Sequence, residues 1–196
     1  MKTFNISKGR FEAFSDGVFA IAITLLVLEI HLPNGAIAPA GQPHALLAIW
    51  PQYVVYFISF GTIGIMWLNH HALFANVQRI THGMVMSNML LLALISFLPF
   101  PTEVLARYGI TSAGTVYYGI TMIAISVAYN IVYQQVLAAH PSAQRKLTLW
   151  TIVGLTLYPI ATLIGYFWPL AGVAAFAALA GFYMLPRNIH AVAITP

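Results

Sequence analysis

The sequence predicts an all-α integral membrane protein with six transmembrane helices. Of its 196 residues, 60% are hydrophobic and only 6% are charged, and the mean hydropathy is +0.84. Soluble domains carry about 25% charged residues, so this composition is typical of a chain that lies mostly in lipid. In addition, the apolar residues form six segments, each near the length of about 20 residues that a helix needs to cross a bilayer.

Loops rich in proline and glycine separate these segments. The expected spans cover residues 11–31, 45–69, 84–106, 112–138, 148–167 and 169–186, within a single membrane domain over residues 1–196. The main breaks lie between Pro33 and Pro43, at His140-Pro141, and at Trp168-Pro169. Prolines within the spans should kink or end helices, because they lack the backbone N–H.

The basic residues predict the orientation. With six spans, seven of the eight basic residues fall on one side of the membrane and only Arg107 on the other. The positive-inside rule then places both termini in the cytoplasm. These basic residues are too scattered for a nucleic-acid surface, and the absence of cysteine excludes disulfides and thiolate chemistry. Asp16 and Glu29, inside the first apolar run, argue against a cleaved signal peptide.

The first span has two chemically different faces. At about 100° per residue, one stripe carries Gly17, Ile21, Thr24, Leu28 and His31, with Leu25 at its edge. Asp16 falls off this stripe, on the side of Phe19, Ile23 and Val27, so we expect its carboxylate to point into the subunit's own bundle. The stripe could pack against a neighbouring helix. It could also line a pore, with Ile21 and Leu28 constricting the path and Thr24 offering hydroxyls. Sequence alone does not choose between these two interpretations.

Polar residues in the second and third spans could hold the Asp16 carboxylate. The topology places them at the membrane depth of Ser15 and Asp16: Trp67, Asn69, His70, His71, Ser87 and Asn88. Together with the guanidinium of Arg10, these groups supply the donors that a buried carboxylate needs.

No catalytic or metal-binding motif accompanies these residues. His70 and His71 are adjacent and about 100° apart on a helix, so they cannot bind one ion as an i, i+4 pair would. The sequence holds no H-E-x-x-H, no G-x-S-x-G and no glycine-rich phosphate loop. We therefore expect no enzyme activity, no metal and no cofactor. A metal-dependent intramembrane enzyme using His70 or His71 remains the alternative that elemental analysis would reveal.

Two motifs stand out in the first three spans. The first is Arg10-x-x-x-Phe14-Ser15-Asp16, followed by Ala20-Ile21-x-x-Thr24. The second is Trp67-x-x-His70-His71-x-Leu73-Phe74, followed by Asn88. Together they resemble the signature of the transmembrane protein 175 family, which comprises the endolysosomal potassium channel of animals and its bacterial and archaeal relatives. The resemblance extends through six spans over nearly the whole chain.

The resemblance implies a potassium-selective channel that lacks the Thr-Val-Gly-Tyr-Gly filter. A chain with one six-span repeat looks like the prokaryotic form, a homotetramer in the cell membrane with the first span around a central axis. Matching positions imply a pore lining of Ile21, Thr24, Leu25 and Leu28, with K⁺ as the permeant ion. They also imply a structural polar network, composed of Arg10, Ser15, Asp16, Trp67, His71 and Asn88.

We therefore expect a leak-like cation channel with a hydrophobic constriction on the first helix. No span carries a ladder of arginines, so no voltage sensor is encoded. The alternative is a proton-coupled secondary transporter or permease, which would need an ionisable residue near mid-membrane and usually a repeat pair with broken helices. His31, at the far end of the stripe, has no role that the sequence assigns.

Overall fold

The computed structural model of the chain describes residues 6–32, 42–108, 110–139 and 149–184, and these parts are mostly helical. The elements are α1 (Lys8–Leu25), the 3₁₀ helix η1 (Leu26–Glu29), α2 (Gln42–Ala48), α3 (Trp50–Phe74), α4 (His82–Phe97), α5 (Pro99–Arg107), α6 (Ser112–Ala138), α7 (Leu149–Phe167) and α8 (Pro169–Met184).

The described residues confirm an all-helical fold with membrane-spanning segments. Four stretches are long and apolar enough to cross a bilayer: Lys8–Glu29, Trp50–Phe74, His82–Arg107 and Ser112–Ala138. Two further apolar helices, Ile152–Phe167 and Pro169–Tyr183, are shorter in the part of the chain that the structure describes. The count of six spans therefore stays a prediction.

Three expected spans differ from the helices observed. The first, 11–31, is α-helical only to Leu25 and ends at Glu29 with the 3₁₀ helix η1. The second, 45–69, is divided between α2 and α3, because Pro51 occupies the first turn of a new helix that continues to Phe74. The third, 84–106, is divided at Leu98 into α4 and α5, since Pro99 and Pro101 lack the N–H groups that would continue the hydrogen-bond ladder.

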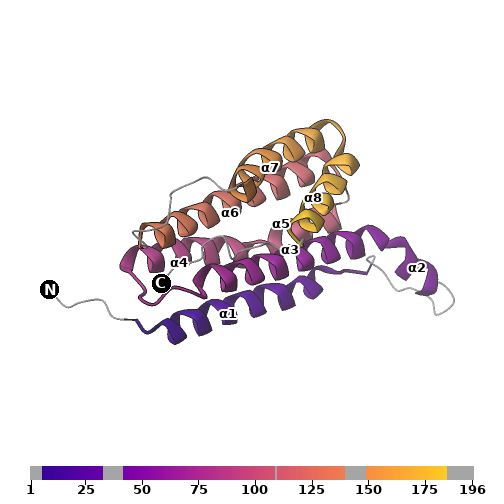
Figure 1. The fold of residues 1–196 in the computed structure, drawn as a ribbon. Coiled ribbons are helices and arrows are strands. Elements are labelled where there is room, and N and C mark those ends of the chain that lie inside the picture. The colour runs from indigo at the N-terminus through magenta and orange to yellow at the C-terminus, as the bar shows by residue number, and fades with distance from the viewer. Residues whose placement is uncertain (1–5, 33–41, 109, 140–148, 185–196) are drawn as a thin grey trace.

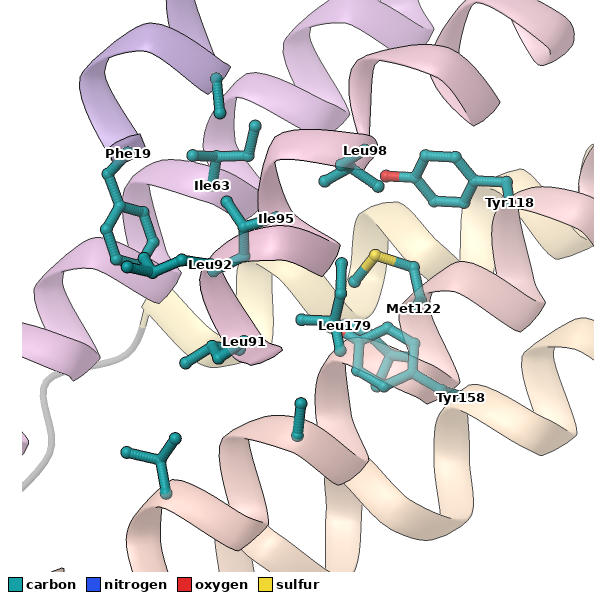
Figure 2. Close-up of a cluster of buried hydrophobic side chains, with 14 of the residues drawn as sticks. Phe19, Ile63, Leu91, Leu92, Ile95, Leu98, Tyr118, Met122, Tyr158 and Leu179 are labelled. Atoms are coloured by element: carbon teal, nitrogen blue, oxygen red, sulfur yellow. The ribbon is translucent and has the colours of Figure 1, made fainter. Parts of the chain in front are cut away.

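The helices pack in layers, with α1 on one side of the molecule (Figure 1). α1 packs on α3 and α4, and η1 packs on α3 and α5. Behind them α6 contacts α4 and α7, while α8 packs on α7 and α3. Figure 2 shows the buried side chains that connect these layers, from Phe19 on α1, through Leu91 and Ile95 on α4, to Met122 on α6 and Tyr158 on α7. One continuous core thus supports the inner face of α1.

A close backbone approach joins α7 and α8 after the turn at Trp168. A Cβ placed on Gly172 would overlap the backbone of Gly165 and the side chain of Thr115. Glycine at these two positions therefore lets the two helices touch, as small residues do in membrane proteins.

We predict that Gly172→Ala lowers the stability of the protein by about 1–3 kcal/mol, because overpacking forces the two backbones apart. The matched control is Gly181→Ala on the same helix, where a Cβ would meet no atom within 4 Å. The measurement is thermal unfolding of both variants in the same detergent. Equal melting temperatures for the two variants would contradict this account of the α7–α8 contact.

Candidate functional site

α1 divides into a buried face and an uncovered face. Phe11, Ser15, Phe19, Ala22 and Leu26 are buried at spacings of three and four residues, as one face of a helix requires. Ser15, at the centre of this face, has an exposed fraction of 0%. The side chains of the opposite face are exposed in the described chain.

Three of the four sequence-predicted pore positions lie on this uncovered face of α1, and the fourth, Leu28, lies on η1 directly after it. Ile21 is 61% exposed, Leu28 is 65% exposed, and Thr24 and Leu25 are exposed as well. Gly17 and His31 of the same stripe are also exposed. Val27 departs from the expectation, because it is exposed instead of facing the bundle. From Leu26 the chain winds as a 3₁₀ helix, which turns by about a third of a circle per residue.

Thr24 presents its hydroxyl oxygen in a defined state. Its Oγ1 lies 2.9 Å from the carbonyl oxygens of both Ala20 and Ile21 and donates its proton to them. The remaining lone pairs of Oγ1 are free to face outward. An oxygen in this state can accept from water or coordinate a cation, and it has no proton to offer an anion.

A chain of three buried polar side chains fixes the inner face of α1. Ser15 Oγ donates to the carbonyl oxygen of Phe11 at 3.0 Å, so it must accept from its other neighbour, Asn88 Nδ2, at 2.9 Å. The remaining amide atom, Asn88 Oδ1, then accepts from His70 Nε2 at 2.8 Å. This sequence of donors and acceptors makes His70 the tautomer protonated at Nε2.

Aromatic rings enclose the buried histidine. The centroid of the His70 ring lies 4.8 Å from that of Phe74, 5.4 Å from that of Phe19 and 6.3 Å from that of Phe11. Two of these phenylalanines belong to α1 itself. In such a dry environment hydrogen bonds are strong and an unpaired polar group is costly, so the chain from His70 to Ser15 holds α1 in one rotation.

Asp16 lies on the flank of α1, whereas we expected from the sequence that its carboxylate would point into the bundle. Its side chain is exposed, and Oδ1 accepts a hydrogen bond of 2.8 Å from Trp67 Nε1 on α3. The physical reason is helical phase: Asp16 follows Ser15, so it projects about 100° from the centre of the buried face. The bond ties the edge of α1 to α3.

The structure brings four of the six sequence-predicted network residues into these two contacts, namely Ser15, Asp16, Trp67 and Asn88. His71 lies near them, with its ring centroid 6.2 Å from that of Trp67, but its neighbour His70 is the histidine bonded to Asn88. Arg10 is exposed, and no hydrogen bond joins it to other described residues. Among the described residues no three histidine or acidic side chains gather as metal ligands would.

Sequence reasoning did not identify two further polar contacts. Lys8 Nζ donates to the carbonyl oxygen of Ala75 at 2.8 Å, at the C-terminal end of α3. Ser59, Thr102 and Tyr118 form a buried hydroxyl cluster between α3, α5 and α6, with oxygen distances of 2.9 and 3.3 Å. Polar residues in three neighbouring spans were the available signal for this cluster, but their helical phase was unknown.

We predict that Asn88→Leu destabilises the protein by about 1–3 kcal/mol, because it leaves the buried His70 Nε2–H without an acceptor. Ser87→Ala is the matched control, since Ser87 Oγ donates only to the Met84 carbonyl of its own helix. Combining Asn88→Leu with His70→Leu should recover part of the loss, because no unpaired donor remains. Thermal unfolding in detergent is measured for the wild-type protein and these three variants. An Asn88→Leu variant as stable as Ser87→Ala would contradict the assigned hydrogen bond between His70 and Asn88.

Comparison with known proteins relates this site to a family. Residues 10–99 match the family described as endosomal/lysosomal potassium channel TMEM175. The matched range includes α3, α4, all of α1 except its first two residues, and Ser15, Asp16, Trp67 and Asn88. A protein of Chamaesiphon minutus named as a potassium channel is 47% identical over 136 residues. That match covers 67% of this chain and 66% of the relative, a little under two thirds of its length.

One further relative and one solved structure match over a larger share of the chain. A protein of a Chryseobacterium species, also named as a potassium channel, is 30% identical over 186 residues, which cover 92% of this chain and 94% of that protein. The crystal structure of a lysosomal potassium-selective channel TMEM175 homolog from Chamaesiphon minutus superposes with a TM-score of 0.82 and 37% identity, covering 90% of this chain and 96% of the other. Family motif, sequence and fold agree, and the chain belongs to the TMEM175 family.

Proposed function

We propose that this chain is the subunit of a potassium-selective, non-voltage-gated cation channel. In this proposal four copies surround a central axis in the cell membrane of a prokaryote, each with six spans and with both termini in the cytoplasm. The uncovered face of α1 lines the pore. The potassium-channel names of the bacterial relatives and the family membership support the activity.

The observation that carries the proposal is the division of α1 into two faces. Polar contacts hold one face against α3 and α4, while Ile21, Thr24 and Leu28 stay uncovered on the other. A helix held in this rotation would present the same three side chains to the axis in every copy. Leu25 would lie at the edge of the same surface.

Selection would take place where these side chains narrow the path. Rings of branched aliphatic side chains at Ile21 and Leu28 form a hydrophobic constriction, in which an ion sheds part of its water. Thr24 lies between them, and its hydroxyl is bonded back to the helix, so it offers lone pairs to a cation and none of the donors that would attract an anion. Because a constriction of this kind can dewet, the closed state would be dry.

The direct test is ion flux from liposomes that contain the purified protein under a potassium gradient. We expect a reversal potential that follows potassium. A potential that follows sodium and potassium equally would remove the claim of selectivity. Flux that saturates and requires a counter-ion would instead indicate a transporter.

We predict that Ile21→Asn raises the cation flux by about tenfold, because a polar ring would keep the constriction wet. The matched control is Ile120→Asn on α6, which makes the same change at a similarly exposed isoleucine away from α1. The measurement is the flux per reconstituted channel for each variant. If Ile21→Asn and Ile120→Asn both leave the flux at the wild-type level, the uncovered face of α1 packs against protein and the pore lies elsewhere.

A further inference from the structure

The C-terminal end of the first span makes a hydrogen bond to a residue of another helix. η1 ends at Glu29, and Ile30 takes an extended conformation with φ −86° and ψ 109°. The backbone N–H of His31 therefore leaves the helix with no acceptor along its own ladder. It donates instead to Gln52 Oε1 on α3, at 2.8 Å.

The backbone of Gln52 is part of a helix. It follows Pro51 in the first turn of α3, and its own backbone N–H is bonded to the Ile49 carbonyl at 2.9 Å. On the other side of the contact, His31 Nδ1 lies 3.0 Å from the carbonyl oxygen of Glu29 and donates to it, which closes the end of η1. The side chain of Gln52 thus joins the last turn of the first span to the first turn of the next long helix.

Leu28 lies between the two fixed points of this segment. Leu26 is fully buried against the bundle, and His31 is held by Gln52, whereas Leu28 between them is uncovered. A 3₁₀ turn has poorer hydrogen-bond geometry than an α-helix, so its own ladder gives little resistance to movement. Besides the packing of Leu26, the hydrogen bond from His31 to Gln52 is a polar contact that joins this segment to another helix.

α3 holds the first span at both of its ends. At the other end of α3, Lys8 donates to the Ala75 carbonyl and Trp67 donates to Asp16. The buried contacts of Ser15 and Asn88 hold the rotation of α1, and the contact between His31 and Gln52 holds the end of the span that follows η1.

We propose that Gln52 is a positioning residue that fixes the Leu28 constriction and thereby determines how strictly the channel distinguishes potassium from sodium. This inference rests on the proposed function, because it requires Leu28 to face the ion path. Potassium and sodium ions carry the same charge, and Leu28 has no oxygen to offer, so a constriction at Leu28 can distinguish them only through its diameter, which must then stay constant. A segment that moves freely would average over several diameters.

The experiment uses three variants of the full chain. Gln52→Leu removes the acceptor while keeping the size of the side chain, and Gln52→Glu keeps an acceptor oxygen at the same reach. Gln78→Leu is the matched control, since it makes the same change at an exposed glutamine beyond the opposite end of α3. All are assayed at high ionic strength, where the charge added by Gln52→Glu is screened.

Two measurements are made on each variant. The first is the ratio of potassium to sodium flux, which does not depend on how many channels fold. The second is the electron paramagnetic resonance line shape of a spin label attached at Leu32→Cys. The natural chain has no cysteine, so this label is unique.

In Gln52→Leu we expect a more mobile label and a flux ratio lower by about threefold or more, the factor that corresponds to one ordinary hydrogen bond. Gln52→Glu should restore both values, and Gln78→Leu should change neither. An unchanged label in Gln52→Leu, a freed label with an unchanged flux ratio, or a Gln52→Glu variant that behaves like Gln52→Leu would each overturn the inference. If the wild-type protein shows no potassium preference, the proposed function fails, while the label still decides whether Gln52 holds the segment.

Discussion

The amide of Asn88 is the contact on which the arrangement of the first span depends. In lipid a helix gains little from turning one apolar face inward, because hydrocarbon tails are as apolar as its neighbours. Directional polar contacts must therefore determine the rotation. Asn88 supplies them by donating to Ser15 Oγ and accepting from His70, so that one amide joins α1, α3 and α4 in their shared core.

This single constraint decides which side chains α1 leaves uncovered. With Ser15 at the centre of the buried face, Thr24 lies nine residues later and about half a turn away. Ile21 precedes Thr24 by about one turn along the chain, and Leu28 follows it by about one turn. Asp16 reaches the flank, where Trp67 meets it. The uncovered stripe and the bond on the flank are thus consequences of the same rotation.

Much of this arrangement could be predicted from hydropathy and helical period. The stripe on the first span could be predicted because it contains a glycine, a threonine and a histidine among branched aliphatic residues. The sequence could not decide which of His70 and His71 bonds to Asn88. The reason is that α3 is apolar around its circumference, so only its packing against neighbouring helices determines which face is buried. The 3₁₀ turn after Leu25 and the contact from His31 to Gln52 depend on α5 and α3 lying beside η1, which no local pattern encodes. The division of the third span at Leu98 agrees with the expectation that prolines within the spans end helices, since Pro99 and Pro101 lack the N–H groups that would continue the ladder.

The exposed carboxylate of Asp16 limits what can cover the free face of α1. An ionised group facing hydrocarbon is expensive, and such residues in membrane spans face a bundle interior or water. Asp16 keeps an exposed side chain even though Trp67 donates to it. Thr24, about two turns further along α1, also places an oxygen on the uncovered side. Its hydroxyl is bonded back to the helix and is tolerated in lipid, whereas an exposed carboxylate is costly there, so Asp16 is the residue that favours protein or water beside α1. In the proposed channel, a second copy of the same helix with water between the copies would meet this requirement. The apolar stripe would then narrow the path, while the polar contacts would determine where the stripe points.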